Sequence, residues 1–181
     1  MLIREKDQET ARAIIEKLKL EPLPFEGGYF RRTYECGEPP VSAAQLRRAG
    51  SGSRLLSTAI YYLVTPEGFS ALHRVKSDEM FHFYAGDAVE MVQIDREGRL
   101  SLHKIGSDIL GGEEPQVLVP KGYWQGLRLI PGGSWALMGT TVTPGFEYED
   151  FELGSRKELT LAFPDLADVI STYTRLPEQV P

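Results

Sequence analysis

Residues 68–86 read GFSALHRVKSDEMFHFYAG and carry the strongest structural signal in the chain. Two runs rich in apolar and aromatic residues, Phe69–Val75 and Glu79–Ala85, flank the polar segment Lys76–Asp78. Runs of this length on either side of a short polar segment are typical of two antiparallel strands joined by a tight turn. We therefore predict a β-hairpin over this stretch.

Two ionisable side chains, His73 and Glu79, come from opposite arms of that hairpin. Residues two apart on a strand share a face, so Glu79 shares its face with Phe81 and Phe83, while His82 is expected to point away. The hairpin would bring the imidazole and the carboxylate within reach of one ion or one substrate. Burial beside the two rings would raise the pKa of Glu79, because apolar surroundings disfavour the charged form. The alternative, in which His73 is a hydrogen-bonded core histidine, stays open.

The rest of the chain predicts a single all-β domain over residues 1–181, with a helix near each end. Apolar residues at helical spacing predict helices over residues 7–18 and 164–173. Short β-rich runs without helices between them indicate an antiparallel sandwich or barrel. The remaining runs are Gly28–Tyr34, Leu55–Thr65, Ala88–Ile94, Leu100–Ile105, Gln116–Pro120, Trp124–Ile130 and Trp135–Thr143.

Composition excludes several classes of function. The 181 residues contain 20 Lys and Arg against 26 Asp and Glu, a formal net charge of −6, and no basic run. Nucleic-acid binding normally needs clustered basic residues, so it is not expected. One cysteine, Cys36, excludes an internal disulfide and a cysteine-based zinc site. The charged start MLIREKDQET is unlike a signal peptide, and no apolar run approaches the roughly 18 residues of a membrane span. We expect a cytoplasmic protein with no membrane partner.

Several segments resemble the cupin superfamily. Gly68-x4-His73-x-Val75-x3-Glu79-x6-Gly86 resembles the first cupin motif, and Pro120-Lys-Gly122-Tyr-Trp-Gln125 resembles the second. Five segments in order are similar to the cupin-5 family, also called domain of unknown function 985. They are Glu26-Gly27-Gly28-Tyr29-Phe30, Ser57-Thr58-Ala59-Ile60-Tyr61, His73-Arg74-x-x-Ser77-Asp78-Glu79, Pro120-x-Gly122-x-Trp124-Gln125 and Thr141-Val142-x-Pro144-Gly145-Phe146. The resemblance implies a double-stranded β-helix, the cupin jelly-roll barrel, with its core at about residues 26–163 and a short helix near each terminus.

The same resemblance implies a candidate metal site that has lost ligands. Metal cupins use two histidines and a glutamate from the first motif and a histidine from the second. Here Val75 and Gln125 replace two of those histidines, and the chain contains no asparagine to close the second motif. His73, Glu79 and Gln125 remain, a set that suits a divalent ion such as Zn, Mn, Fe or Ni. A metal-free polar pocket built from these residues is the alternative, and we favour it slightly.

Two functions compete for this pocket. His73 stands where a resembling group of cupins, the epimerases of nucleotide-linked keto sugars, has its catalytic base. That implies an isomerase-, epimerase- or lyase-like enzyme that transfers a proton on a sugar or sugar acid, with His73 and Glu79 catalytic. Phe81, Phe83, Gln125 and one of the neighbouring tyrosines, Tyr61, would bind substrate. The alternatives are a non-catalytic binder of a small ligand in the same pocket and a barrel filled by its own side chains.

A homodimer is the expected assembly. An antiparallel sandwich leaves unpaired strand edges, which are a liability unless they are covered. The strand Gly28–Tyr34 is the candidate for crossing to the partner.

Overall fold

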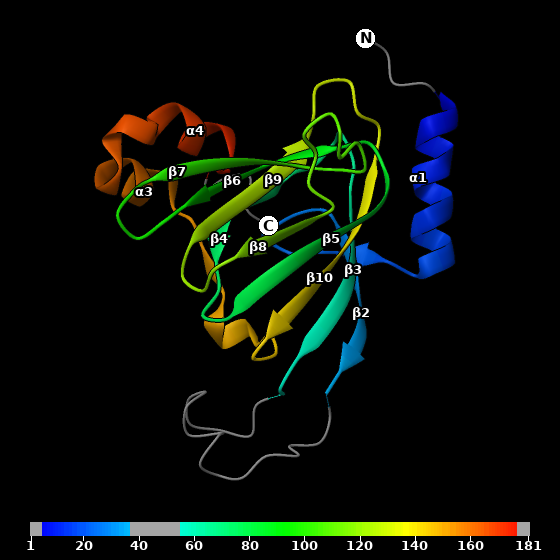
Figure 1. Cartoon of the computed structure of the whole chain (residues 1–181), viewed down its shortest axis with the longest axis horizontal. Coiled ribbons are helices and arrows are strands. Elements are labelled where there is room, and N and C mark those ends of the chain that lie inside the picture. Colours follow the sequence, from blue (N-terminus) through cyan, green and yellow to red (C-terminus); the bar gives the residue numbers. More distant parts are fainter. Residues whose placement is uncertain (1–4, 37–54, 177–181) are drawn as a thin grey trace.

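Two antiparallel sheets face each other in the computed structural model, which describes residues 5–36 and 55–176 (Figure 1). The larger sheet has the strand order β1-β2-β3-β10-β5-β8. Its strands are β1 (Glu21–Pro22), β2 (Tyr29–Glu35), β3 (Thr58–Val64), β10 (Ala136–Thr143), β5 (Asp78–Gly86) and β8 (Gln116–Val119). The smaller sheet has the order β11-β4-β9-β6-β7. Its strands are β11 (Glu152–Leu153), β4 (Ser70–Arg74), β9 (Trp124–Leu129), β6 (Val89–Ile94) and β7 (Leu100–Ile105).

All nine predicted β runs contain a strand, so the mostly β fold with two antiparallel sheets is confirmed. The two-residue strands β1 and β11 were not predicted, because so short a pairing has no periodicity of its own. The strand Gly28–Tyr34 corresponds to β2, which pairs with β1 and with β3 of the same chain.

The predicted hairpin over residues 68–86 is wrong. β4 belongs to the smaller sheet, where it pairs with β9 and β11. β5 belongs to the larger sheet, where it pairs with β10 and β8. The segment between them carries the chain from one sheet to the other. Alternation of apolar residues shows only that each strand has a buried face, and two such faces are also buried when the strands oppose each other across a core.

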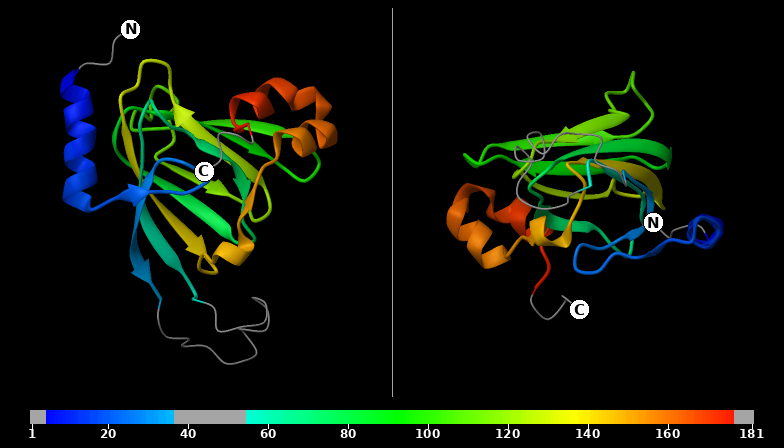
Figure 2. Two further views of the ribbon diagram at one scale, coloured as in Figure 1. Left: turned by 180° about the vertical axis from the view of Figure 1, so that it is seen from behind. Right: turned by 90° about the horizontal axis from the view of Figure 1, so that it is seen from below.

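Helices lie at two sides of the sandwich, and no described helix is long and apolar enough to span a membrane (Figure 2). α1 (Glu5–Leu18) agrees with the helix predicted from residue 7. At the other end the helix predicted over residues 164–173 is present as the 3₁₀ turn η2 (Pro164–Leu166) followed by α4 (Ala167–Thr172). A further helix, α3 (Arg156–Ala162), precedes it. The start of α3 was missed although Ser155 and Glu158 have capping-box spacing, and the Ser155 side chain accepts a hydrogen bond from the Glu158 backbone N–H.

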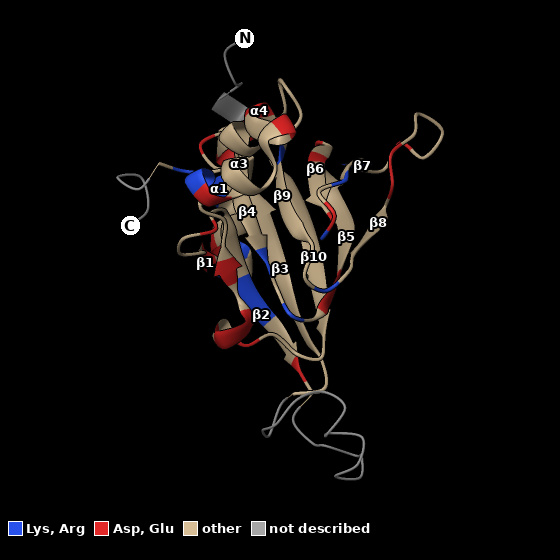
Figure 3. Cartoon of the chain, turned by 90° about the vertical axis from the view of Figure 1, so that its left-hand side faces the viewer, with Lys and Arg blue, Asp and Glu red and all other residues tan. Residues whose placement is uncertain are grey.

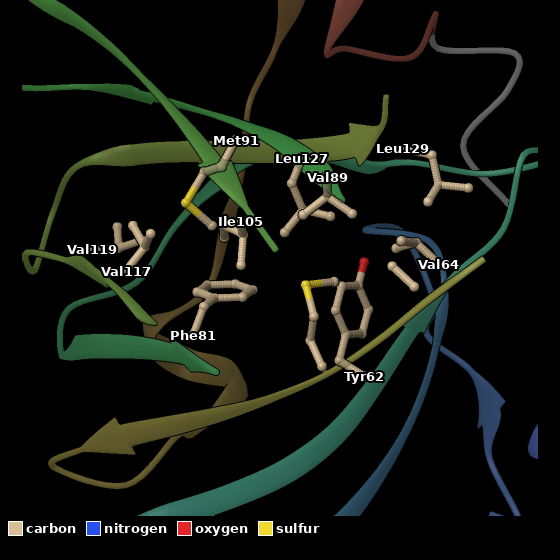
Figure 4. Packing of buried hydrophobic residues seen from close by; sticks show 12 residues of the cluster. Tyr62, Val64, Phe81, Val89, Met91, Ile105, Val117, Val119, Leu127 and Leu129 are labelled. Carbon is tan, nitrogen blue, oxygen red and sulfur yellow. The ribbon is translucent and has the colours of Figure 1, made fainter. Parts of the chain in front are cut away.

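The main hydrophobic core fills the space between the sheets. Its members come from both sheets, and Figure 4 shows Phe81 and Tyr62 pointing from the larger sheet toward Leu127, Val89 and Met91 of the smaller one. A second cluster packs the helices at the carboxyl end against the outer side of the smaller sheet, around Leu72, Val92, Ile94, Trp124, Leu159, Ile170 and Tyr173. The remaining space between the sheets is a cavity.

Candidate active site

A small cavity opens between the two sheets beside the main core. Its volume is about 60 Å³, counted as the space open to the centres of water molecules. At roughly 10–15 Å³ per water by this measure, it has room for a few waters or a compact polar group. Its wall is mostly apolar and includes a few polar side chains. The lining residues are Leu23, Glu26, Phe30, Arg32, Thr58, Ile60, Tyr62, His73, Val75, Glu79, Phe81, Thr140, Val142, Phe146 and Tyr148.

The register of the larger sheet brings its part of the wall together. Val142 of β10 stands opposite Glu79 of β5. Two residues along each strand, Thr140 stands opposite Phe81. Directly paired residues on neighbouring strands present their side chains to the same face. Glu79, Phe81 and Thr140 therefore enter the cavity from one sheet.

His73 enters the cavity from the opposite sheet, and it is 3% exposed. Its Nδ1 lies 2.8 Å from the carbonyl oxygen of Ala71. A carbonyl only accepts hydrogen bonds, so Nδ1 carries a proton and a neutral ring has its lone pair on Nε2. The ring stacks on Phe151 with centroids 5.3 Å apart, which fixes its plane. His73 thus offers one free basic nitrogen in a fixed orientation.

Glu79 is a buried carboxyl group held by Gln125. The side-chain Nε2 of Gln125 donates to Glu79 Oε2 at 2.7 Å, and Gln125 itself is 1% exposed. Burial raises the pKa of Glu79, and the nearby His73 acts against that rise. The direction is the one expected from the sequence, since a desolvated carboxylate favours its neutral form. Glu79 is therefore suited to hold and donate a proton.

Glu26 supplies a second carboxylate, which was not among the predicted site residues. Its Oε2 lies 3.8 Å from Nε2 of His73, and its Oε1 accepts a hydrogen bond from the Ser70 hydroxyl at 2.8 Å. The side chain of Arg175 donates to the Glu26 carbonyl oxygen at 2.6 Å and holds the loop in place. The available signal was the segment Glu26–Phe30, which carries part of the family resemblance.

Of the two neighbouring tyrosines on β3, Tyr62 lines the cavity and Tyr61 does not. The Tyr62 hydroxyl donates to the carbonyl oxygen of Gly27 at 2.9 Å. Burial raises its pKa well above the ordinary tyrosine value, and the charge of Glu26 adds to that rise. Tyr61 instead meets Tyr84 edge to face with centroids 6.1 Å apart. The predicted substrate residue Tyr61 thus lies outside this cavity. Parity shows that adjacent residues face opposite ways but not which way is inward.

The two predicted wall phenylalanines separate. Phe81 lines the cavity, whereas Phe83 packs against the main core and is not among the lining residues. Phe83 lies next to the register shift between Leu137 and Met138 of β10. His82 faces the other side of the sheet, as expected, where its Nε2 contacts the Thr141 hydroxyl at 3.2 Å.

The three residues proposed as metal ligands fit a metal ion poorly in this arrangement. Gln125 presents its NH₂ group, a donor, to Glu79, and that group has no lone pair for a cation. Its Oε1 is buried without a hydrogen-bond partner in the described structure. No group of three or more His, Cys, Asp and Glu side chains within residues 5–36 and 55–176 could hold a metal ion.

Comparison with known families gives a match over most of the chain. The family model of Cupin_5, described as Cupin superfamily (DUF985), matches residues 12–154. The uncharacterized protein YML079W of Saccharomyces cerevisiae is 30% identical over an alignment of 138 residues, with 69% of this chain and 66% of that protein covered. This chain thus spans just under two thirds of that relative. Protein SO0799 from Shewanella oneidensis has a solved structure with a TM-score of 0.80 and 34% identity, covering 91% of this chain and 97% of that one.

A more distant likeness concerns the fold alone. Oxalate decarboxylase from Bacillus subtilis superimposes with a TM-score of 0.51 at 16% identity, covering 86% of this chain and 37% of that chain. That decarboxylase has Mn(II) centers.

Proposed function

The chain belongs to the Cupin_5 family of the cupin superfamily (DUF985), and from that premise we propose that it is an enzyme acting on a small sugar or sugar acid. The reaction is a proton transfer at a carbon next to a carbonyl group. In this proposal the two facing sheets of the protein form the double-stranded β-helix of a cupin barrel, and the substrate binds between them. One observation carries the proposal: a free imidazole nitrogen and a buried carboxyl group with a raised pKa line the same cavity from opposite sheets.

His73 acts as the base. Nε2 removes the proton from the carbon next to the carbonyl, and the electron pair of that C–H bond moves toward the carbonyl, whose oxygen gains the charge. Glu79 donates its proton to this oxygen, and a neutral enediol results. The imidazolium then protonates the neighbouring carbon, which gives an isomer, or a water molecule protonates the original carbon on the other face, which gives an epimer. In the second case the imidazolium returns its proton to the hydroxide that the water leaves. The enediol hydroxyl that becomes the carbonyl gives its proton to the Glu79 carboxylate, so both residues regain their starting states. Acids and bases placed in this way typically contribute rate factors of about 10²–10⁴ each.

Glu26 stabilises the charged state of the base. When His73 takes up the proton, the resulting imidazolium lies 3.8 Å from Glu26 Oε2. Opposite charges at such a distance favour each other more strongly in buried surroundings than in water. The hydrogen bond from Ser70 keeps the carboxylate turned toward the ring. Glu26 thereby serves as the acidic partner of His73.

The size of the cavity limits the substrate. A volume of about 60 Å³ admits the reacting end of a small molecule and leaves the rest at the mouth. Val75, Phe81 and Val142 form apolar wall around that end and keep most water away from it. A compact hydroxy-carbonyl compound fits these conditions better than a large nucleotide-linked one.

Deuterium uptake tests the proposal directly. The protein is incubated in D₂O with a panel of aldoses, ketoses and uronates, and the loss of C–H signal next to the carbonyl is followed by NMR. We expect exchange with at least one compound and its loss in His73→Gln. The matched control is His103→Gln, a histidine on β7 that pairs with Glu114 away from the cavity. Equal exchange in the two variants would contradict the role of His73.

A non-catalytic ligand-binding protein is the second candidate. It is favoured by Gln125, which occupies the second-motif histidine position and already satisfies Glu79 with a hydrogen bond. Under this alternative the same panel raises the melting temperature of the protein without any deuterium uptake. That combination of results would replace the enzyme proposal with a binding function.

A further inference from the structure

Arg32 is the cationic side chain at the mouth of the cavity. Among the described lining residues it is the only Arg or Lys. It is half-buried on β2, a strand near the edge of the larger sheet whose ribbon is basic over part of its length (Figure 3). Its neighbour Arg31 is exposed and lies over the outward ring of Tyr61, 5.4 Å from the centroid. The strand therefore sends one arginine to the cavity and the other to the outer surface.

The register of the sheet places Arg32 in line with the polar groups deeper inside. Arg32 of β2 stands opposite Ile60 of β3, and Ile60 stands opposite Thr140 of β10. Two strand spacings of about 4.8 Å separate the backbones of Arg32 and Thr140. Because the arginine side chain itself spans part of that gap, a ligand only a few carbon atoms long can reach from the guanidinium to Thr140 and Glu79.

The present partner of Arg32 is easily exchanged. Its Nη1 contacts Glu35 Oε1 at 2.6 Å, and the two side chains are 35% and 51% exposed. Exposed ion pairs of this kind contribute only about 0–1 kcal/mol. A ligand carboxylate can replace Glu35 and accept two parallel N–H bonds from the planar guanidinium.

Charges inside the cavity decide which end of a ligand lies at the mouth. The Glu26 carboxylate lines its interior, so a negative group on the ligand would be repelled there. Hydroxyl groups, in contrast, can donate to carboxylates and exchange hydrogen bonds with Thr58 and Thr140. Phe146 and Tyr148, in edge-to-face contact at 5.3 Å, shield the space beside the mouth.

We propose that Arg32 is a carboxylate-binding subsite that selects small sugar acids over the corresponding neutral sugars. The carboxylate binds to the guanidinium at the mouth, and the hydroxyl and carbonyl groups extend toward His73 and Glu79. This subsite depends on the proposed function in one respect: the end of the ligand that lies inside the cavity is taken to be the end that reacts.

The test compares charged and neutral probes on the full chain. Dissociation constants of D-glucuronate and D-galacturonate are measured by NMR titration beside those of D-glucose and D-galactose. We expect at least one uronate to bind about tenfold or more tightly than its aldose, a preference lost in Arg32→Gln. Arg31→Gln removes the same charge from the same strand but from the outer surface, and is expected to keep the preference. Glu35→Gln removes the competing carboxylate and is expected to tighten uronate binding.

Arg32→Lys guards against a loss caused by misfolding. It keeps the charge but lacks the fork of N–H donors, so a partial preference is expected. Failure of both uronates to bind, equal affinity for uronate and aldose, or equal losses in Arg31→Gln and Arg32→Gln would each overturn the subsite. Uronate preference without deuterium uptake would leave the subsite standing and refute the proton-transfer function. If the protein instead binds uronate and aldose with equal affinity and exchanges deuterium into both, the proton-transfer function would stand and the carboxylate subsite would be refuted.

Discussion

At the scale of single residues, Glu79 is a carboxyl group buried away from water. It is 8% exposed and accepts a hydrogen bond from the Gln125 amide, and the Thr140 side chain adds a second hydrogen bond. A carboxylate in such a place is costly, and that cost appears as a raised pKa rather than as an unpaired charge. The stability of the protein should therefore depend on pH through this residue.

Glu79→Gln is expected to weaken that pH dependence. With its pKa raised in the folded state, Glu79 contributes stability fully below its ordinary value of 4.5, and this contribution is lost as pH rises through the raised pKa. Glutamine has no charge to desolvate and keeps an oxygen that can accept from Gln125. The free energy of unfolding of the variant should rise relative to that of the wild type over this window, by at most about 1.4 kcal/mol per pH unit.

Urea denaturation at a series of pH values from about 4 to about 8 measures the difference. Glu67→Gln, at an exposed position, serves as the control and should follow the wild type at every pH. A constant offset between Glu79→Gln and wild type across the whole range would show that Glu79 is not titrating in this way.

At the scale of elements, the turn between β1 and β2 determines where Glu26 lies. The Leu23 N–H donates to the Gly28 carbonyl oxygen at 3.0 Å, and the Gly27 N–H donates to that of Leu23 at 3.1 Å. The carbonyl oxygen of Glu26 accepts from the Ala71 N–H on β4 at 2.9 Å. The turn is thereby fastened to the strand that carries His73, which explains why its carboxylate meets the imidazole.

Gly28→Ala should lower the free energy of unfolding much more than Gly112→Ala, although both glycines have left-handed backbone. Gly28 has φ = +77°, and an added Cβ would lie 2.8 Å from the Tyr62 ring and hydroxyl. Left-handed backbone costs a non-glycine residue about 1–2 kcal/mol, and overpacking adds about 1–3 kcal/mol. We expect a loss of about 2–5 kcal/mol in the free energy of unfolding.

Gly112→Ala is the matched control. Its φ is +88°, but an added Cβ would meet nothing within 4 Å among the described atoms. Only the backbone cost of about 1–2 kcal/mol should appear there. Urea denaturation of both variants gives the comparison, and equal losses would mean that Tyr62 does not pack tightly on the turn.

At the scale of the whole molecule, the outer face of the larger sheet bears exposed apolar side chains. Tyr84 of β5 is 51% exposed and meets Tyr61 edge to face, and Leu118 of the neighbouring strand β8 is 47% exposed. Apolar groups gathered on one face often mark an interaction surface. At one edge of this sheet β8 has four residues. At the other edge β1 pairs only with Tyr29 and Phe30, and the rest of β2, Arg31–Glu35, carries charged side chains, which disfavour edge pairing. The sheet face is therefore the stronger route to association.

We therefore expect the homodimer to form through this face. Light scattering should give a mass near twice that of the 20.3 kDa chain. Leu118→Asp should lower the mass toward that of one chain, because a charge would be buried in the contact. Leu102→Asp, at an exposed leucine of the smaller sheet, should leave the mass unchanged. A wild-type mass near 20.3 kDa would refute the dimer.

Much of the architecture could be predicted because its signals are local. Runs rich in β-forming residues identified all nine longer strands, and helical spacing identified α1. Motif spacing identified the family and singled out His73, Glu79 and Gln125, of which the first two line one cavity and the third is bonded to Glu79. In each case the deciding residues lie within one short segment.

The rest depended on how distant segments meet. Whether β4 and β5 pair with each other or face each other is a choice between two ways of burying the same apolar faces, and the surrounding strands make that choice. For the same reason parity could not separate Tyr62 from Tyr61. Glu26 comes within 3.8 Å of His73, 47 positions further along the chain, only because its turn is fastened to β4. By itself, then, the sequence determined the strands, the family and one half of the site. Closure of the two sheets decided the other half, because contacts between distant residues arise only when the core is formed.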